Sequence, residues 1–407
     1  MNMAVFTSEL STVHHRVLWA LGKDSSTVMT ESPKKRGSVV KEPSHASKAM
    51  GVILPCIGYF MVLAFGPTIL RRCAVAAGID LNGQGTTGNA LADAAGVVLL
   101  FLVLAEAPLP GPLVVTVAAT LASIPMHVYG TAVKAMLSYV DEWSFMAFVV
   151  PYTICCTYWL TSTVAYIIEY FNLFPVEDRI IQPRRRLLPK DPKFHKLLRV
   201  CALSTIVLVP LIGMGSFYLQ QYRDTIGLYV DMDPERLPSK LEIAVQMIYF
   251  ILVNEFLFFY GHWLFHASPY LYKKIHKMHH EYPAPNVFAS LYCHPLELVI
   301  ADFVPLGAGA FCLGAHCSTF LLWSIYAVLG TEGHHSGIRW PWIVWFDHQP
   351  DFHDFHHEKF HVNYGNIGFV DKMHGTDGLW RAHLAQLRAS REKEGPESVT
   401  ALNRYCD

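Results

Sequence analysis

The sequence predicts an all-α protein, a polytopic integral membrane helical bundle with a cytosolic, histidine-rich cap. Two observations support this fold class. The 407-residue chain is 52% hydrophobic and only 16% charged, whereas soluble domains carry about a quarter charged residues. Histidines also concentrate in the last third of the chain, in short clusters beside long apolar runs.

The apolar runs predict the membrane helices. They occupy 50–70, about 94–105, 111–128, 144–173, 198–219 and 241–261. A bilayer crossing takes roughly 20 apolar residues, so several runs are long enough. Pro and Gly residues interrupt the stretch over 94–128, which we interpret as two short crossings. The apolar stretch at 298–330 contains PLGAG and LGAH and predicts a helical hairpin.

Composition divides the chain into five parts. Residues 1–48 are polar and predict a disordered cytosolic tail, with an organelle transit segment as the alternative. Residues 49–175 hold the N-terminal transmembrane segments, 176–197 form a basic cytosolic loop, 198–385 form the catalytic-type domain, and 386–407 form a C-terminal tail.

The basic loop sets the expected orientation. Its short run of Lys and Arg outnumbers its acids, which places it in the cytosol by the positive-inside rule. The arginines either set this topology or bind anionic headgroups. The next loop, 220–242, is acid-rich and is expected on the far side, so the chain returns to the cytosol after 241–261.

Two further features exclude classes of protein. The net charge is −1, so no overall basic field indicates a nucleic-acid partner. The nine cysteines contain no CxxC pair, so neither a zinc finger nor a disulfide framework is indicated.

Three histidine boxes dominate the last third of the chain. GHWLFH has the spacing i, i+4, while HKMHH and HDFHH each have the spacing i, i+3, i+4, which places imidazoles on one helix face. One metal site takes about four ligands, so eight converging imidazoles imply two metals and a di-metal cap. Imidazole ligands suit iron, copper, nickel or zinc.

At these boxes the sequence resembles the membrane di-iron fatty acid hydroxylase and sterol desaturase superfamily. The resemblance covers roughly 240–380 and includes HEYPAPNVFASLYCHPLE, HHSGIRWPW and VDKMHGTD. It is closest to the C4-methylsterol oxidases and the fatty acid hydroxylase domain-containing proteins. One departure is Phe352, where relatives often have a histidine before the third box.

The resemblance implies a set of metal ligands. These are His262, His266, His276, His279, His280, His294, His335, His353, His356 and His357. His334 is the alternative to His335. Glu255 and Asp354 are expected to orient ligand imidazoles through hydrogen bonds to their carboxylates. Asp371 is expected to have a similar role. His361 is expected to be an ordinary surface residue.

The resemblance also implies chemistry and partners. We expect two iron ions that use O2, with electrons passed from NAD(P)H through an external cytochrome b5-type donor and its reductase. The expected location is the endoplasmic reticulum membrane, with the boxes on the cytosolic side and a sterol or other lipid as substrate.

The expected activity is that of a C4-methylsterol monooxygenase, which oxidises the sterol C4 methyl group in sterol biosynthesis. One alternative is a hydroxylase or desaturase of another lipid: a fatty acyl chain, a sphingoid base or an alkylglycerol. The other is a non-catalytic, metal-binding membrane scaffold.

Overall fold

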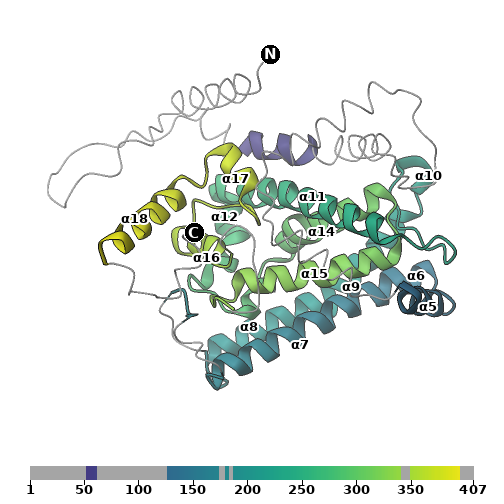
Figure 1. Cartoon of the computed structure of the whole chain (residues 1–407), viewed down its shortest axis with the longest axis horizontal. Coiled ribbons are helices and arrows are strands. Elements are labelled where there is room, and N and C mark those ends of the chain that lie inside the picture. Colours follow the sequence, from purple (N-terminus) through teal and green to yellow (C-terminus); the bar gives the residue numbers. More distant parts are fainter. Residues whose placement is uncertain (1–51, 62–125, 174–178, 183–186, 341–348, 395–407) are drawn as a thin grey trace, which may run out of the picture.

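The computed structural model describes residues 52–61, 126–173, 179–182, 187–340 and 349–394, and it confirms the all-α prediction. Within these ranges, β-type pairing is limited to two isolated bridges, Ile180 with Ile338 and Asp231 with His316. Four helical segments in these ranges are long and apolar enough to cross a membrane. Figure 1 shows the helices as a bundle with the C-terminal elements gathered at one end.

The first two candidate spans lie along one side of the bundle (Figure 1). One combines α6 (Glu142–Ser144), the π-helix η1 (Phe145–Val149) and α7 (Val150–Tyr170). The other combines α8 (Pro192–Leu203), the π-helix η3 (Ser204–Leu208) and α9 (Val209–Gln220). Each covers 29 residues, about 43 Å at 1.5 Å per residue, which exceeds the roughly 30 Å hydrocarbon core.

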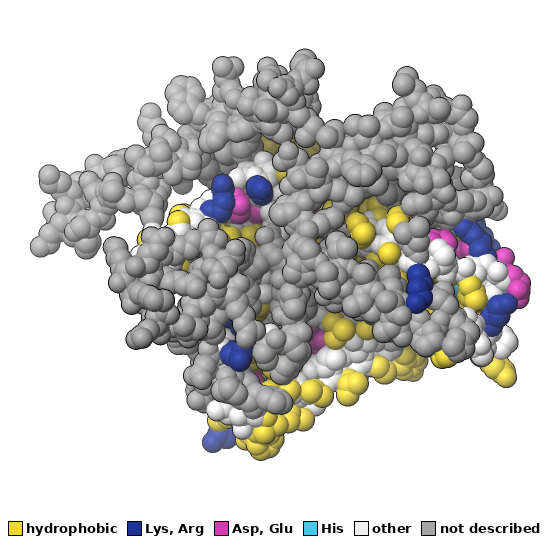
Figure 2. Space-filling model, viewed as in Figure 1, with side chains coloured by type: hydrophobic (Ala, Val, Ile, Leu, Met, Phe, Trp, Pro, Cys, Tyr) yellow, Lys and Arg dark blue, Asp and Glu magenta, His cyan; other side chains and the backbone are white. Residues whose placement is uncertain are grey.

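A glycine lets these two segments approach closely. A Cβ atom on Gly213 would lie 2.2 Å from the backbone oxygen of Met146, so only hydrogen fits there. The outer face carries exposed apolar side chains, including Leu160, Ile206 and Leu211. Figure 2 shows this apolar face along the lower edge of the molecule. It is suited to contact lipid tails.

The other two candidate spans form the centre. Helix α11 (Lys240–Ala267) packs on α14 (Val304–Leu313), which continues α13 (Pro295–Glu297) and the π-helix η6 (Leu298–Phe303). A tight turn at Gly314, with φ +60°, leads into α15 (Cys317–His335), which packs on α7. The hairpin predicted over 298–330 is therefore confirmed.

Shorter elements complete the end of the bundle where the boxes lie. They are α12 (Pro269–Lys274), the 3₁₀ helices η4 (His276–Glu281) and η5 (Val287–Leu291), α16 (Asp351–Lys359), α17 (Phe369–His374) and α18 (Gly378–Glu394). At the opposite end lie α5 (Met126–Leu137) and α10 (Arg223–Ile226). A helix over Val52–Met61 contacts α11, where Gly58 lies against the Tyr260 ring. It also contacts η6, where the Tyr59 hydroxyl donates to the Ile300 carbonyl at 2.9 Å.

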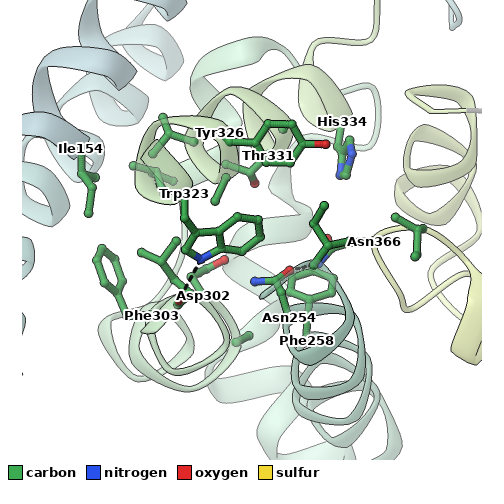
Figure 3. A pocket seen from close by; sticks show the side chains of 18 residues that line it. Ile154, Asn254, Phe258, Asp302, Phe303, Trp323, Tyr326, Thr331, His334 and Asn366 are labelled. Carbon is green, nitrogen blue, oxygen red and sulfur yellow. Dashed lines mark hydrogen bonds between the residues drawn. The ribbon is translucent and has the colours of Figure 1, made fainter. Parts of the chain in front are cut away.

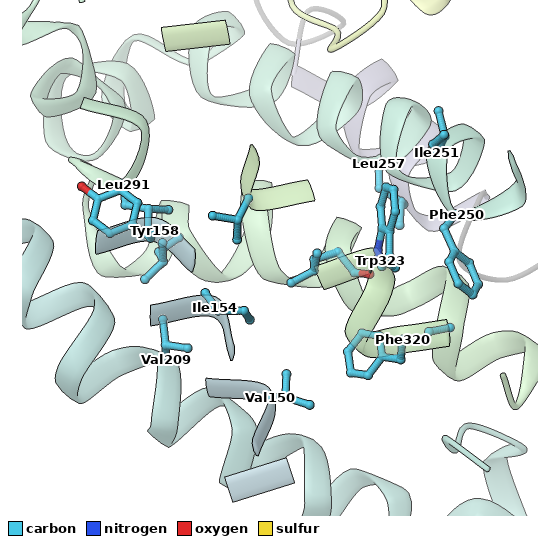
Figure 4. Packing of buried hydrophobic residues seen from close by; sticks show 14 of the residues in the cluster. Val150, Ile154, Tyr158, Val209, Phe250, Ile251, Leu257, Leu291, Phe320 and Trp323 are labelled. Atoms are coloured by element: carbon cyan, nitrogen blue, oxygen red, sulfur yellow. Dashed lines mark hydrogen bonds between the residues drawn. The ribbon is translucent and has the colours of Figure 1, made fainter. Parts of the chain in front are cut away.

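One main hydrophobic core joins the spans beneath the boxes. Buried Tyr158 from α7 donates its hydroxyl to the carbonyl of Phe288 in η5 at 2.9 Å. Trp323 from α15 donates to the Leu306 carbonyl at 2.8 Å. Figure 4 shows these aromatic groups among Val, Ile and Leu side chains from α7, α9, α11 and α15. The core therefore fixes α15 against both pairs of spans.

Two predicted boundaries differ from the structure. The basic loop over 176–197 ends earlier, because α8 already begins at Pro192. The tail expected from 386 is helical up to Glu394, because α18 continues to that residue. Three predictions lie outside the described residues: the tail over 1–48, the crossing at 94–105, and nearly all of that at 111–128.

Candidate metal centre

Four helical elements deliver the box histidines to one place. Helix α11 carries His262 and His266 one turn apart near its C-terminal end. The second box lies on the 3₁₀ helix η4, the third on α16, and His335 is the last residue of α15. The α-helical geometry expected of the second box is therefore replaced by a tighter 3₁₀ turn.

Nine of the ten histidines predicted as ligands lie in two compact groups, each with ligand nitrogens within 4.8 Å of one another. The first group, here called site A, comprises His262, His266, His276, His280 and His356. The second group, here called site B, comprises His279, His335, His353 and His357. All except His266 are buried.

The Nε2 atoms of site A converge. The Nε2 atom of His276 lies 3.1 Å from that of His262 and 2.9 Å from that of His280. The Nε2 atom of His280 lies 3.2 Å from those of His266 and His356. Five ring nitrogens thus surround one small volume.

Hydrogen bonds from the outer Nδ1 atoms determine whether the inner Nε2 atoms carry a proton or a lone pair. His262 donates from Nδ1 to the Tyr364 carbonyl at 2.8 Å, and His356 donates from Nδ1 to the Val362 carbonyl at 2.6 Å. A neutral imidazole that donates from Nδ1 has only a lone pair at Nε2. The two inner nitrogens are therefore acceptors and cannot hydrogen-bond to each other. Converging lone pairs of this kind fit a shared cation.

Site B repeats this pattern. The Nε2 atom of His335 lies 3.1 Å from that of His279 and 2.9 Å from that of His353. His335 donates from Nδ1 to the Thr331 carbonyl at 2.8 Å, and His279 donates from Nδ1 to the Tyr292 carbonyl at 3.3 Å. Lone pairs again face one another at the centre.

The nitrogen separations fit a metal ion. Ligands about 2.0–2.1 Å from a metal and at right angles lie about 3.0 Å apart, close to the 2.9–3.2 Å observed. Both ring nitrogens of His357 are buried with no hydrogen-bond partner among the described residues. An orphaned imidazole at this position is explained if it binds a metal.

Burial keeps these imidazoles neutral. Desolvation lowers the pKa of His279 to about 4. Desolvation, followed by repulsion from neighbouring imidazoles, also lowers the pKa of His353 and His357 well below the usual range. Only a neutral imidazole can bind a metal, so the fold holds the ligands in the binding-competent state at neutral pH.

His294 lies outside both groups. Its Nδ1 atom accepts from the backbone N–H of Leu296 at 3.2 Å, which makes it the N-cap of α13. The prediction that it is a metal ligand is not supported by its position. The geometry favours His335 over His334, because His335 belongs to site B and His334 does not.

Glu255 supports the site through the backbone. Its carboxylate is buried and accepts from the N–H groups of Asn366, Ile367 and Val370 at 2.7–3.2 Å. These bonds hold the segment that presents the Tyr364 carbonyl to His262. The predicted orienting role is thus exerted one step further from the imidazole than expected.

Asp371 holds the same segment from the other side. Its carboxylate accepts from the N–H groups of Tyr364 at 2.7 Å and Gly365 at 2.6 Å. Burial, followed by repulsion from Glu255, raises the pKa of Asp371 to about 7. A Cβ atom on Gly365 would lie 2.6 Å from Oε1 of Glu255 and 2.7 Å from Oδ2 of Asp371, so this position requires glycine.

Asp354 has a different main contact from the one predicted. Its Oδ2 atom accepts from the Gln182 amide at 2.7 Å. Gln182 follows the short pairing of Ile180 with Ile338. Asp354 therefore ties α16 to the chain before α8. His361 is exposed, as expected for a surface residue.

The sequence reasoning missed Glu297. Its Oε1 atom accepts from Nδ1 of His276 at 2.7 Å, and both side chains are buried. Glu297 follows His294 by three residues in YCHPLE. The clue was a carboxylate inside an otherwise apolar stretch, beside a histidine that caps the helix.

An apolar cavity lies beside the histidines, among α11, η6 and α15 (Figure 3). His334 and Thr331 line it, and the carbonyl of Thr331 holds His335 of site B. Its volume is about 110 Å³, somewhat less than the roughly 150 Å³ of a cavity that takes up benzene. It can hold the end of a lipid, with the remainder extending outside.

The part of the chain that carries the box histidines is similar to known proteins. Residues 247–376 match the model of the fatty acid hydroxylase family. The chain is 39% identical over 202 residues to fatty acid hydroxylase domain-containing protein 2 of Homo sapiens, covering 49% of this chain and 57% of the relative.

Plant relatives are named for other activities. Methylsterol monooxygenase 2-2 of Arabidopsis thaliana is 34% identical over 36% of this chain and 57% of its own length. Very-long-chain aldehyde decarbonylase GL1-11 of Oryza sativa subsp. indica is 33% identical over 39% of this chain and 60% of its own length. The chain thus spans a little over half the length of these relatives. No solved structure matches it.

Proposed function

We propose that the protein is a membrane-bound di-iron oxygenase of lipids, since residues 247–376 match the model of the fatty acid hydroxylase family. The finer proposal is a C4-methylsterol monooxygenase, which oxidises the C4 methyl group of a sterol. The observation that carries the oxygenase proposal is the pair of converging imidazole groups beside an apolar cavity. Iron, when bound there, supplies the oxidising power toward an unactivated C–H bond that no side chain provides.

The protein's own residues perform three tasks in this proposal. Site A and site B hold two metals in adjacent positions through neutral imidazoles. The outward acceptors, such as the Tyr364 and Thr331 carbonyls, keep those rings in fixed tautomers. The buried surroundings exclude water from the reacting groups.

The cavity positions the substrate. Its lining is mainly apolar and includes Ile251, Phe258 and Trp323, which suits a hydrocarbon. His334 faces it next to site B. The likeness to methylsterol monooxygenases favours a 4-methylsterol. The likeness to aldehyde decarbonylases keeps other lipids in the test panel.

Electrons and location complete the proposal. We place the protein in the endoplasmic reticulum membrane, where a cytochrome b5-type donor and its reductase pass electrons from NAD(P)H. Exposed Lys273, Lys274 and Lys277 lie at the box end, whereas acidic Asp233 and Glu235 lie in the loop before α11. This asymmetry supports boxes on the cytosolic side.

The test is a product assay. Membranes containing the full chain receive NADPH, O2 and a panel of 4,4-dimethylsterol, ceramide and alkylglycerol, with His356→Ala membranes as control. Oxygenated 4-methyl products formed only by the intact protein support the proposal. Oxygen on another panel member replaces the substrate. Bound metals without any product favour the non-catalytic scaffold.

A further inference from the structure

Asp302 is an acidic residue inside an apolar cavity at membrane depth. It lies in η6, within the candidate span Pro295–Leu313, and lines the cavity beside site B. Figure 3 shows its side chain near the centre of this space, between Trp323 and Asn254. A carboxyl group within a membrane span costs free energy, so such residues usually have a polar partner or a function.

The neighbouring protein groups satisfy this carboxyl group poorly. Its partner among the described residues is the thiol of Cys293, with Sγ 3.9 Å from Oδ2. A thiol is a weak donor, and this separation is long. No Lys or Arg lies among the residues that line the cavity. The carboxyl group therefore has capacity to accept a further hydrogen bond from a ligand in the cavity.

Three other polar side chains of the cavity, Asn254, Asn366 and Trp323, already have hydrogen-bond partners. The Asn366 side-chain amide donates to the Asn254 carbonyl oxygen at 2.7 Å. The Trp323 indole donates to the Leu306 carbonyl. Asp302 is thus the lining residue with the largest unused hydrogen-bonding capacity.

The local backbone aims two carboxyl groups in different directions. Glu297, at the start of the segment, contacts His276 of site A, whereas Asp302 faces the cavity. The π-helix η6 begins directly after Glu297 and contains Asp302. Single π-turns inside helices occur frequently at functional sites. Here the turn links the metal centre to the cavity within six residues of chain.

We propose that Asp302 binds a hydroxyl group of the lipid substrate and thereby selects hydroxyl-bearing lipids. This inference rests on the proposed lipid-binding function of the cavity. A hydroxyl both donates and accepts, so it pairs with a carboxyl group in either protonation state. A cationic amine fits less well, because it would bring a second charge into an apolar site.

The test measures binding rather than turnover, with two matched pairs of radiolabelled probes. The first pair is 4,4-dimethylsterol and its 3-O-methyl ether; the second is 1-hexadecanol and 1-methoxyhexadecane. The full chain is studied in nanodiscs as wild type, Asp302→Asn and Asp302→Val. The Asn variant keeps the shape and one hydrogen bond, so it covers the case in which Val disrupts folding.

The wild type is expected to bind the hydroxyl member of at least one pair about tenfold to 100-fold more tightly, as expected for a buried hydrogen bond to a charged group. Asp302→Val should reduce this ratio to near one, and Asp302→Asn should leave an intermediate ratio. As control, Val328→Ala changes the cavity wall and should affect both members of a pair alike.

An unchanged hydroxyl preference in Asp302→Val, in protein that retains its metal, would overturn the inference. The inference would also be overturned if the wild type showed no preference for the hydroxyl member of either pair. Failure of the oxygenase proposal is distinguishable, because it would abolish product formation while leaving the Asp302-dependent binding ratio intact.

Discussion

The Nδ1 atom of His276 lies 2.7 Å from Oε1 of Glu297, and 1% and 5% of these two side chains are exposed. A buried carboxylate behind an imidazole fixes the ring and increases its basicity as a ligand. The contact joins site A to the start of a membrane span, because Glu297 belongs to α13. The imidazoles of site A are therefore held in part by a candidate membrane span.

Removing this carboxylate should weaken metal binding at site A. Glu297→Leu is expected to lower metal affinity by about 10–100-fold, the range usual for loss of such a partner. Glu297→Gln keeps an acceptor oxygen and should lose less. Metal content after dialysis against graded chelator measures both. Equal retention in Glu297→Leu and wild type would show that the contact does not support binding.

The two sites should lose metal separately. His353→Ala leaves three imidazoles in site B and should lose the metal there, so about one of two metals remains. His356→Ala leaves four in site A and should weaken metal affinity at that site alone. The matched control is His294→Ala, which alters a helix cap outside both sites. Elemental analysis of the purified chain decides it. If His294→Ala lost as much metal as His353→Ala, His294 would be a metal ligand after all.

Gly365 should tolerate no side chain. Gly365→Ala places a methyl group within 2.7 Å of both the Glu255 and Asp371 carboxylates, and overpacking of this kind costs about 1–3 kcal/mol. The displaced segment also carries the Tyr364 carbonyl, so site A should lose metal. Gly378→Ala is the control, since nothing lies within 4 Å of its Cβ position. Thermal unfolding and metal content of the two variants should differ; matching values would contradict this account.

The metal-free protein should lose stability in mild acid. The pKa of His279 is about 4 in the folded chain, below the ordinary value of 6.5. Between these values the unfolded chain binds more protons, so the free energy of unfolding falls as pH decreases from about 6.5 toward 4. Bound metal should shift this loss to lower pH, because it competes with protons for the same nitrogens. Unfolding curves of metal-free and metal-loaded protein across this range provide the measurement, and coincident curves would count against ligation by these imidazoles.

The sequence alone predicted the candidate membrane spans that the structure describes and most of the candidate ligands. Apolar runs long enough to cross a bilayer can hardly adopt another structure there, since every backbone polar group must be paired internally. The boxes also identified eight of the nine histidines that the fold brings together, because closely spaced imidazoles on one short helical element stay near one another. The ninth, His335, was implied only by the family resemblance.

Only the tertiary structure decided how the histidines divide between site A and site B. It also decided which groups hydrogen-bond to their outer nitrogens. His279 and His280 are adjacent in the chain, yet the 3₁₀ turn directs them into site B and site A respectively. Glu297 and Asp302 gain their roles from packing against η4 and the cavity, which no local pattern encodes. The contacts that support the imidazoles join residues far apart in sequence, so they follow from how the helices pack and not from periodicity.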